Sequence, residues 1–127
     1  MDLTQLTEDE RSVVARTWAY RAESERRATG RFARLTRELE ETGASPVVIE
    51  MTRNAVDDER RHTQICDEIA AEYGWQVPES PIPADPAPLG PTHLSQADRV
   101  LFEMMAFCGF TETLNAAMLT QILKTTT

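Results

Sequence analysis

The sequence predicts an all-α fold, a bundle of long helices with one long crossover connection. Three stretches carry apolar residues at helical spacing, and each opens with residues that cap helices. Six of the seven prolines fall in the single segment between the second and third stretches. No strand pattern or internal repeat stands out. At 127 residues we expect one helical domain, residues 1–127.

The first expected helix covers residues 8–42. Thr7 and Glu10 form a capping box ahead of it, and the helical pattern continues until Gly43. At 1.5 Å per residue such a helix is about 50 Å long, which is long for a globular protein and typical of a bundle.

A second helix is expected over residues 46–73. Ser45 can cap it, and Pro46 suits the first helical position because no intrahelical N–H bond is made there. Only a short turn at Gly43 and Ala44 separates the two helices, so we expect them to form an antiparallel hairpin.

Residues 75–94 are expected to form an extended crossover. Prolines exclude helix or central strand there, namely Pro78, Pro81, Pro83, Pro86, Pro88 and Pro91. Because polyproline-like chain advances about 3.1 Å per residue, this segment can travel the length of a helix, which antiparallel neighbours would not need.

The third expected helix covers residues 96–124, after a capping pattern of Ser95 and Asp98. It is apolar almost all round, as in a helix enclosed by several neighbours, and its phase points Leu101 and Met105 inward. A hairpin, a long crossover and another helix make up three quarters of a four-helix bundle with one crossover. The fourth helix is therefore expected to be missing or to come from another chain or segment.

Composition narrows the classes of partner. The formal net charge of −8 argues against nucleic acid or an anionic membrane as the main partner, because both need a basic face. No apolar run approaches the roughly 18 residues of a membrane span, and the acidic N-terminus does not resemble a signal peptide. Cys66 and Cys108 lie within apolar helical patterns and fit reduced core thiols. We therefore expect a cytoplasmic location.

Each of the three helical stretches carries one acidic residue where its apolar face should continue, and these are Glu25, Glu59 and Glu112. His62 follows Glu59 by one turn, and Asn115 lies beside Glu112 on the same face. A buried unpaired carboxylate is costly, so inward acids need a partner. Glu103 projects to the opposite side of its helix and is expected to be a surface acid.

A Glu and a His three positions apart on a helix share one face, so both can reach one metal ion while a carboxylate from a facing helix bridges to a second. Carboxylate oxygen and neutral imidazole suit iron or manganese. The competing interpretation is that the Glu59-x-x-His62 pair is a chance pattern and that the inward acids pair with Arg21, Arg31 or Arg34. A zinc site is a minor alternative, because Cys66 follows His62 by four positions.

The residues resemble a known family. Glu25, followed after a long interval by Asp58-Glu59-Arg60-Arg61-His62, is similar to the first half of the signature of ferritin-like di-iron carboxylate proteins. The segment Cys108-Gly109-Phe110-Thr111-Glu112-Thr113-Leu114 resembles the start of the second half. The resemblance implies a ferritin-like four-helix bundle with two iron ions per complete site. It implies that Glu25, Glu59, His62 and Glu112 bind iron, and that Asp58 orients a histidine across the bundle.

The family also has a second Glu-x-x-His on a fourth helix, which this sequence lacks. We expect the chain to be incomplete at its C-terminus. Alternatively, the fourth helix comes from another polypeptide, or a symmetric dimer of hairpins completes the set of ligands. Association, as a homo-oligomer or with the missing helix, is expected because three helices leave the apolar surface of the third partly uncovered.

The leading hypothesis for function is a non-haem di-iron oxidase or oxygenase that uses oxygen and an unidentified small-molecule substrate. The second is a ferroxidase that deposits iron in a large cage. The third is a metal-free helical scaffold that binds a partner, in which Glu25→Ala would change stability or assembly but not metal content.

Overall fold

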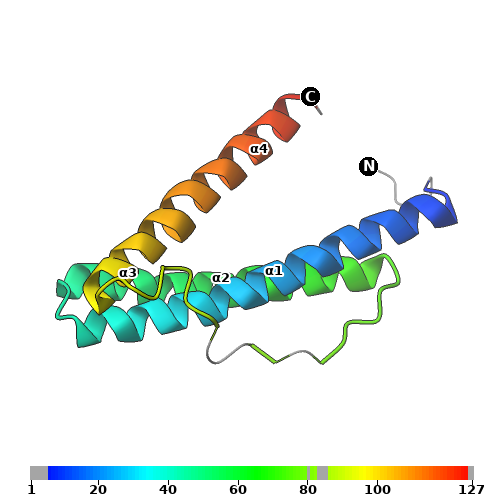
Figure 1. Cartoon of the computed structure of the whole chain (residues 1–127). Coiled ribbons are helices and arrows are strands. Elements are labelled where there is room, and N and C mark those ends of the chain that lie inside the picture. Colours follow the sequence, from blue (N-terminus) through cyan, green and yellow to red (C-terminus); the bar gives the residue numbers. More distant parts are fainter. Residues whose placement is uncertain (1–5, 80, 83–85, 126–127) are drawn as a thin grey trace.

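The computed structural model describes residues 6–79, 81–82 and 86–125. The described residues form helices and loops only, so the all-α prediction and the three helical stretches are confirmed. The third stretch contains a π-helical segment, η2, between two α-helical parts. The elements are α1 (Glu8–Glu41), α2 (Pro46–Glu72), α3 (Gln96–Glu103), η2 (Met104–Thr111) and α4 (Glu112–Thr125) (Figure 1).

The ends of α1 follow from its terminal residues. The Thr7 hydroxyl accepts a hydrogen bond from the Glu10 amide at 3.3 Å, and the Glu10 carboxylate accepts one from the Thr7 amide at 2.8 Å. This is the predicted capping box. The helix ends where Gly43 takes a φ of +70°, a left-handed conformation that glycine adopts without a Cβ clash.

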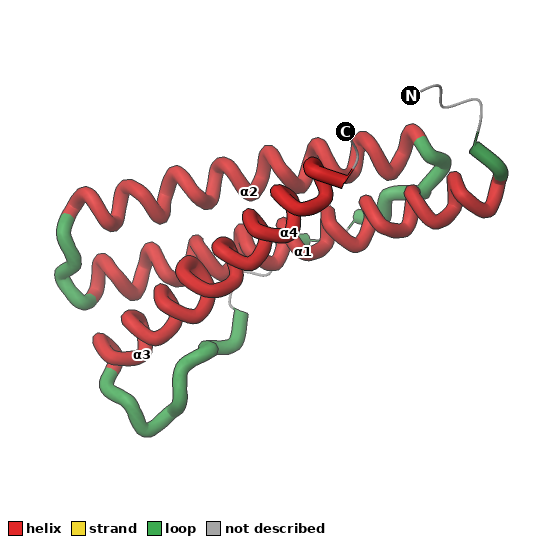
Figure 2. Tube along the Cα trace, turned by 90° about the horizontal axis from the view of Figure 1, so that it is seen from above, coloured by secondary structure: helices red, strands yellow, loops and turns green. Residues whose placement is uncertain are grey.

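The predicted hairpin is present, because α2 begins directly after this turn. The Ser45 hydroxyl accepts from the Val48 amide at 3.4 Å, and Pro46 occupies the first turn. The two helices lie side by side along most of their length (Figure 2). Their contact buries small and aliphatic side chains, including Ala22, Leu35, Leu39, Val56 and Ala70.

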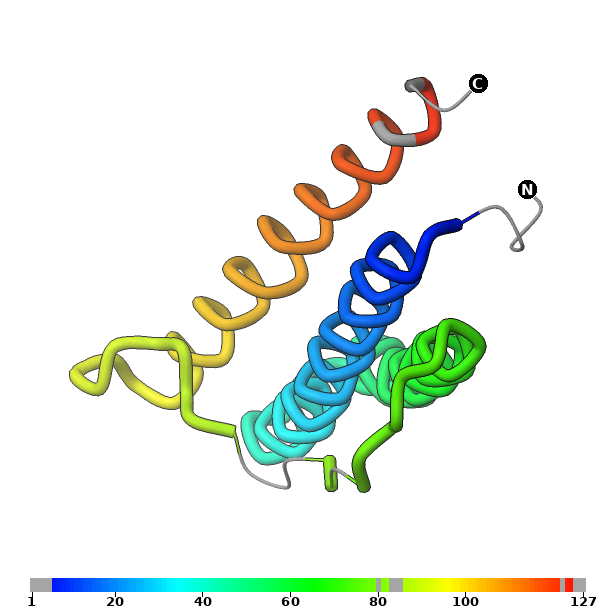
Figure 3. The backbone as a smooth tube through the Cα atoms, turned by 90° about the vertical axis from the view of Figure 1, so that its right-hand side faces the viewer, coloured from blue at the N-terminus to red at the C-terminus, as the bar shows by residue number. Residues whose placement is uncertain are grey.

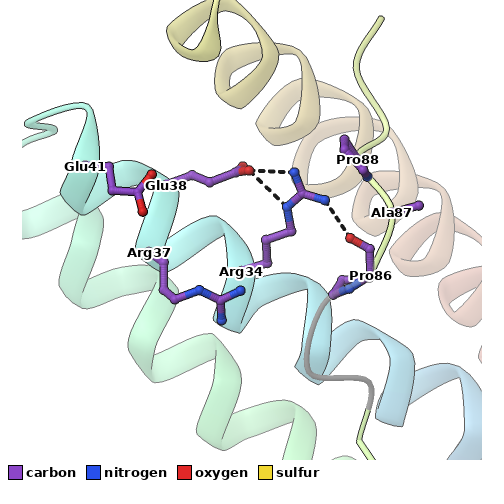
Figure 4. Close-up of a pocket in the computed structure, with 7 residues that line it drawn as sticks. All are labelled: Arg34, Arg37, Glu38, Glu41, Pro86, Ala87 and Pro88. Atoms are coloured by element: carbon purple, nitrogen blue, oxygen red, sulfur yellow. Dashed lines mark hydrogen bonds and ion pairs between the residues drawn. The ribbon is translucent and has the colours of Figure 1, made fainter. Parts of the chain in front are cut away.

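The crossover leaves α2 at Gly74, which has a φ of +93°. Its described residues carry no helix or strand, and the chain returns along the hairpin toward its turn (Figure 1). Arg34 holds the returning chain: its guanidinium donates to the Pro86 carbonyl and to the Glu38 carboxylate (Figure 4). Pro83, one of the predicted connector prolines, lies outside the described residues.

The packed face of the third stretch differs from the predicted one. The helical phase points Leu101 and Met105 inward, but both are exposed. Val100 and Glu103 are buried instead, and the Phe107 ring packs on Phe32 of α1 with 4.9 Å between ring centroids. The prediction that Glu103 is a surface acid is therefore wrong.

Beyond Phe107 the chain departs from the hairpin. In the views of Figures 1 and 3, α4 rises away from α1 and α2, with which it makes at most a minor contact. The expectation of a helix enclosed by neighbours is not met in the described chain, because the apolar side chains of α4 whose positions are described are exposed. These include Leu114, Met118, Leu119 and Leu123. None of the described helices has the length and apolar character needed to cross a membrane.

Candidate metal centre

Glu25 of α1 meets Glu59 and His62 of α2 at the middle of the hairpin. Each side chain offers one donor atom, and these three atoms lie within 4.8 Å of one another. Among the described residues they are the one group of three or more acidic, histidine or cysteine side chains with this spacing. The positions follow from helical phase: Glu25 interrupts the buried face of α1, and His62 lies one turn beyond Glu59 on α2.

Glu59 lies at the centre of this cluster. The residue is only 8 % exposed, and its Oε2 atom lies 3.1 Å from Nδ1 of His62. Burial raises the pKa of the Glu59 carboxyl to about 7. The hydrogen bond and negative charge of Glu25 act in the same direction, and His62 opposes them. In the metal-free protein the Glu59 carboxyl therefore keeps its proton up to about pH 7.

Arg21 supplies a cation to the same cluster. Its Nη2 atom lies 2.9 Å from Oε1 of Glu25, one helical turn away. Cys66 is also close: burial raises the pKa of its thiol, the Glu25 charge raises it further, and Arg21 opposes through its charge and a hydrogen bond. This Arg21–Glu25 pair is one that the metal-free interpretation predicts.

The donor set fits a divalent cation. A metal with bonds of about 2.1 Å holds neighbouring ligand atoms about 3.0–3.4 Å apart, so donor atoms that lie within 4.8 Å of one another need to approach by up to about 2 Å. A cation bound to Glu59 would replace the proton that burial and the neighbouring Glu25 keep on this carboxyl. Two carboxylates with one imidazole suit iron or manganese.

Glu112 and Asn115 lie apart from this cluster. Both are exposed, and they line one wall of a cleft of about 400 Å³ between α1 and the η2–α4 segment, whose other wall includes Arg21 and Glu25. Asp58 is exposed and pairs with Arg61 at 2.8 Å. The structure thus brings together three of the four expected ligands and places the fourth across a cleft from Glu25.

The sequence interpretation missed the buried pair of Arg31 and Glu103. Nη1 of Arg31 lies 2.8 Å from Oε1 of Glu103, and the Glu103 side chain is 2 % exposed. In the sequence interpretation, Arg31 is considered only as a partner of the inward acids, and not as a partner of Glu103. The one indication of the pair was that Glu103 follows the apolar Val100 by three positions and so shares its face.

Comparison of this chain with models of protein families, with curated proteins and with solved structures finds no match.

Proposed function

We propose that this chain is a ferritin-like metal-binding protein in which Glu25, Glu59 and His62 hold iron, and that it oxidises or oxygenates a small substrate. The observation that carries the proposal is the convergence of two carboxylates at the contact of α1 and α2 with the exposed imidazole of His62, all within 4.8 Å. Other acids of these helices, such as Glu23 and Asp58, pair with arginines of their own helix, as Glu25 does with Arg21, but they lie outside the cluster.

The residues have separate roles in this proposal. Glu25 and Glu59 supply negative charge from two helices, and neutral His62 supplies nitrogen, which together suit a ferrous ion. Iron, when bound, supplies the electrons for reducing dioxygen. The Glu59 residue is 8 % exposed and the His62 side chain is 55 % exposed, so the cluster opens to solvent on the His62 side. The cleft beside Glu25 is of a size that takes a small molecule. Glu112 reaches this centre only if α4 approaches α1 more closely, and a two-iron site needs further ligands, such as the second Glu-x-x-His that this sequence lacks.

Metal content tests the proposal directly. The wild type and the Glu59→Ala and His62→Ala variants are purified from iron-supplemented cells and analysed by elemental mass spectrometry. We expect bound iron in the wild type and its loss in both variants. Glu68→Ala, which removes an exposed acid from α2, is the matched control and should retain the metal. A folded wild type without metal contradicts the proposal.

The metal-free scaffold is the second candidate, and the Arg21–Glu25 ion pair favours it because it already supplies Glu25 with a cation. Under this hypothesis Glu25→Ala lowers stability without changing metal content, so the same measurements on that variant separate the two functions. The storage alternative requires a large cage, which native mass spectrometry of the purified protein detects.

A further inference from the structure

The cluster of Glu25, Glu59 and His62 has a cationic neighbour that the proposed ligand set does not use. Arg21 lies one turn before Glu25 on α1, and its guanidinium contacts the Glu25 carboxylate at 2.9 Å. The two side chains differ in exposure: the Arg21 side chain is 42 % exposed and that of Glu25 is 16 % exposed. The guanidinium therefore reaches an inward carboxylate from the solvent side.

Arg21 also lines the cleft between α1 and the η2–α4 segment, together with Glu25. A guanidinium withdrawn from Glu25 consequently has open space next to it, and no packed side chain must move first. A divalent cation at the cluster would bind the same carboxylate and would repel the guanidinium. Arg21 and the metal are thus alternative cations for Glu25.

We propose that Arg21 is an exchangeable counter-cation of the metal centre: it neutralises Glu25 in the metal-free protein and leaves Glu25 when a metal ion binds. This inference rests on the proposed metal-binding function and adds a residue that sets the affinity. Metal binding then carries the cost of breaking the Arg21–Glu25 pair. Cations that bind carboxylates weakly are disfavoured relative to transition metals, which gain more from the His62 nitrogen.

Arg27 provides a matched control on the same helix. It carries the same charge and lines the same cleft, but it pairs with Glu23 at 3.0 Å and its side chain is 73 % exposed. Because solvent and salt screen an exposed charge, its removal should alter the metal affinity only slightly. Arg21→Gln and Arg27→Gln therefore make the same change in net charge and differ in the contact with Glu25.

The affinity for Co²⁺, an air-stable substitute for Fe²⁺, is measured by titration of its visible absorption in the full chain. We expect Arg21→Gln to bind Co²⁺ about tenfold more tightly than the wild type, and Arg27→Gln to stay within about twofold. Arg21→Lys keeps the positive charge, so its affinity for Co²⁺ should be closer to that of the wild type than to that of Arg21→Gln. Equal affinities of Arg21→Gln and Arg27→Gln overturn the inference.

A second readout follows the guanidinium itself. The Nε–H signals of Arg21 and Arg27 are assigned from the two glutamine variants, and Zn²⁺ is added as a diamagnetic ion. The Arg21 signal should shift on saturation while the Arg27 signal stays in place, and an unmoved Arg21 signal in a metal-bound protein overturns the inference. Failure of the wild type and of Arg21→Gln to bind either ion would instead contradict the proposed function, and this inference with it.

Discussion

Arg31 of α1 and Glu103 of α3 form an ion pair with 2.8 Å between Nη1 and Oε1, although they are separated by 72 positions in the chain. The same guanidinium donates to the Ala87 carbonyl at 3.3 Å, and Oε2 of Glu103 accepts from the Leu89 amide at 3.4 Å. The pair therefore joins α1, the crossover and α3 at one point, which sets where the third helical stretch leaves the hairpin.

Loss of the Arg31 guanidinium should weaken the docking of α3 on the hairpin. Arg31→Met leaves the buried Glu103 carboxylate without its cation, at an expected cost of about 3–5 kcal/mol. The double variant Arg31→Met with Glu103→Leu removes both charges and should recover most of that stability. Urea denaturation and amide hydrogen exchange of α3 measure the two effects. If the double variant is as unstable as the single one, the pair acts through packing and not through its charge.

The stability of the metal-free protein should decrease as the pH rises from about 4.5 to about 7 through the contribution of Glu59. The unfolded chain releases the Glu59 proton near the ordinary pKa of 4.5, whereas the folded protein retains it up to about 7. The folded state thus binds more protons in this window, so stability is lost with rising pH, by up to about 3 kcal/mol.

Glu59→Gln isolates this effect because glutamine does not titrate. Urea denaturation with a chelator at about pH 5 and about pH 8 should show a smaller loss of stability in Glu59→Gln than in the wild type. Glu50→Gln, which changes an exposed acid of the same helix, should keep the wild-type dependence. If Glu59→Gln loses as much stability between these two pH values as the wild type does, a group other than Glu59 holds the proton.

Glu25→Ala and Glu112→Ala should affect binding of the first metal ion differently. Glu25 is one of the three converging donors, so its loss should weaken Co²⁺ binding by about tenfold or more. Glu112 is exposed and lies outside that group, so Glu112→Ala should leave the first equivalent unchanged. The measurement is a Co²⁺ titration of both variants. An equal loss in Glu112→Ala would indicate that α4 closes over the cleft in the metal-bound protein.

Substitution by alanine should lower the stability of the protein at one glycine, Gly43, and raise it at another, Gly109. Gly43 has a φ of +70°, where a Cβ costs about 1 kcal/mol, so Gly43→Ala should lower the melting temperature. Gly109 is in the helical segment η2, and a Cβ there has no heavy atom within 4 Å, so Gly109→Ala should gain about 0.5–1 kcal/mol. Thermal unfolding followed by circular dichroism compares the two. A gain in Gly43→Ala would contradict the role assigned to this turn.

The hairpin was predictable because its determinants are local. The cap residues Thr7 and Ser45 and the glycine at position 43 fix the ends of α1 and α2 within one residue of the expected ranges. An uninterrupted phase of 100° per residue then brings Glu25, Glu59 and His62 within 4.8 Å of one another where the two helices meet. The close pairing of Arg21 with Glu25 is also a local relation, four positions apart on one helix.

The face of the third stretch was not predictable in the same way. In the π-helical segment η2 the backbone hydrogen bonds span five residues, so each residue turns through less than 100°. The exposure of Leu101 has another cause because Leu101 precedes η2: the buried contacts of Val100 and Glu103 turn that side of α3 toward α1. The partner of Glu103 was also hidden, because an ion pair across 72 positions leaves no local pattern in the sequence.

The hairpin has a consequence for the order in which the molecule assembles. All three converging donors lie on α1 and α2, and only the short turn at Thr42–Ser45 has to close for them to meet. Closing so small a loop costs little entropy and is fast, whereas docking of α3 must wait for the whole crossover to emerge during synthesis. The centre is therefore complete in its three donors before α3 exists. In the proposed metal centre, a metal ion would then meet its three donors on the nascent hairpin, before α3 docks on α1.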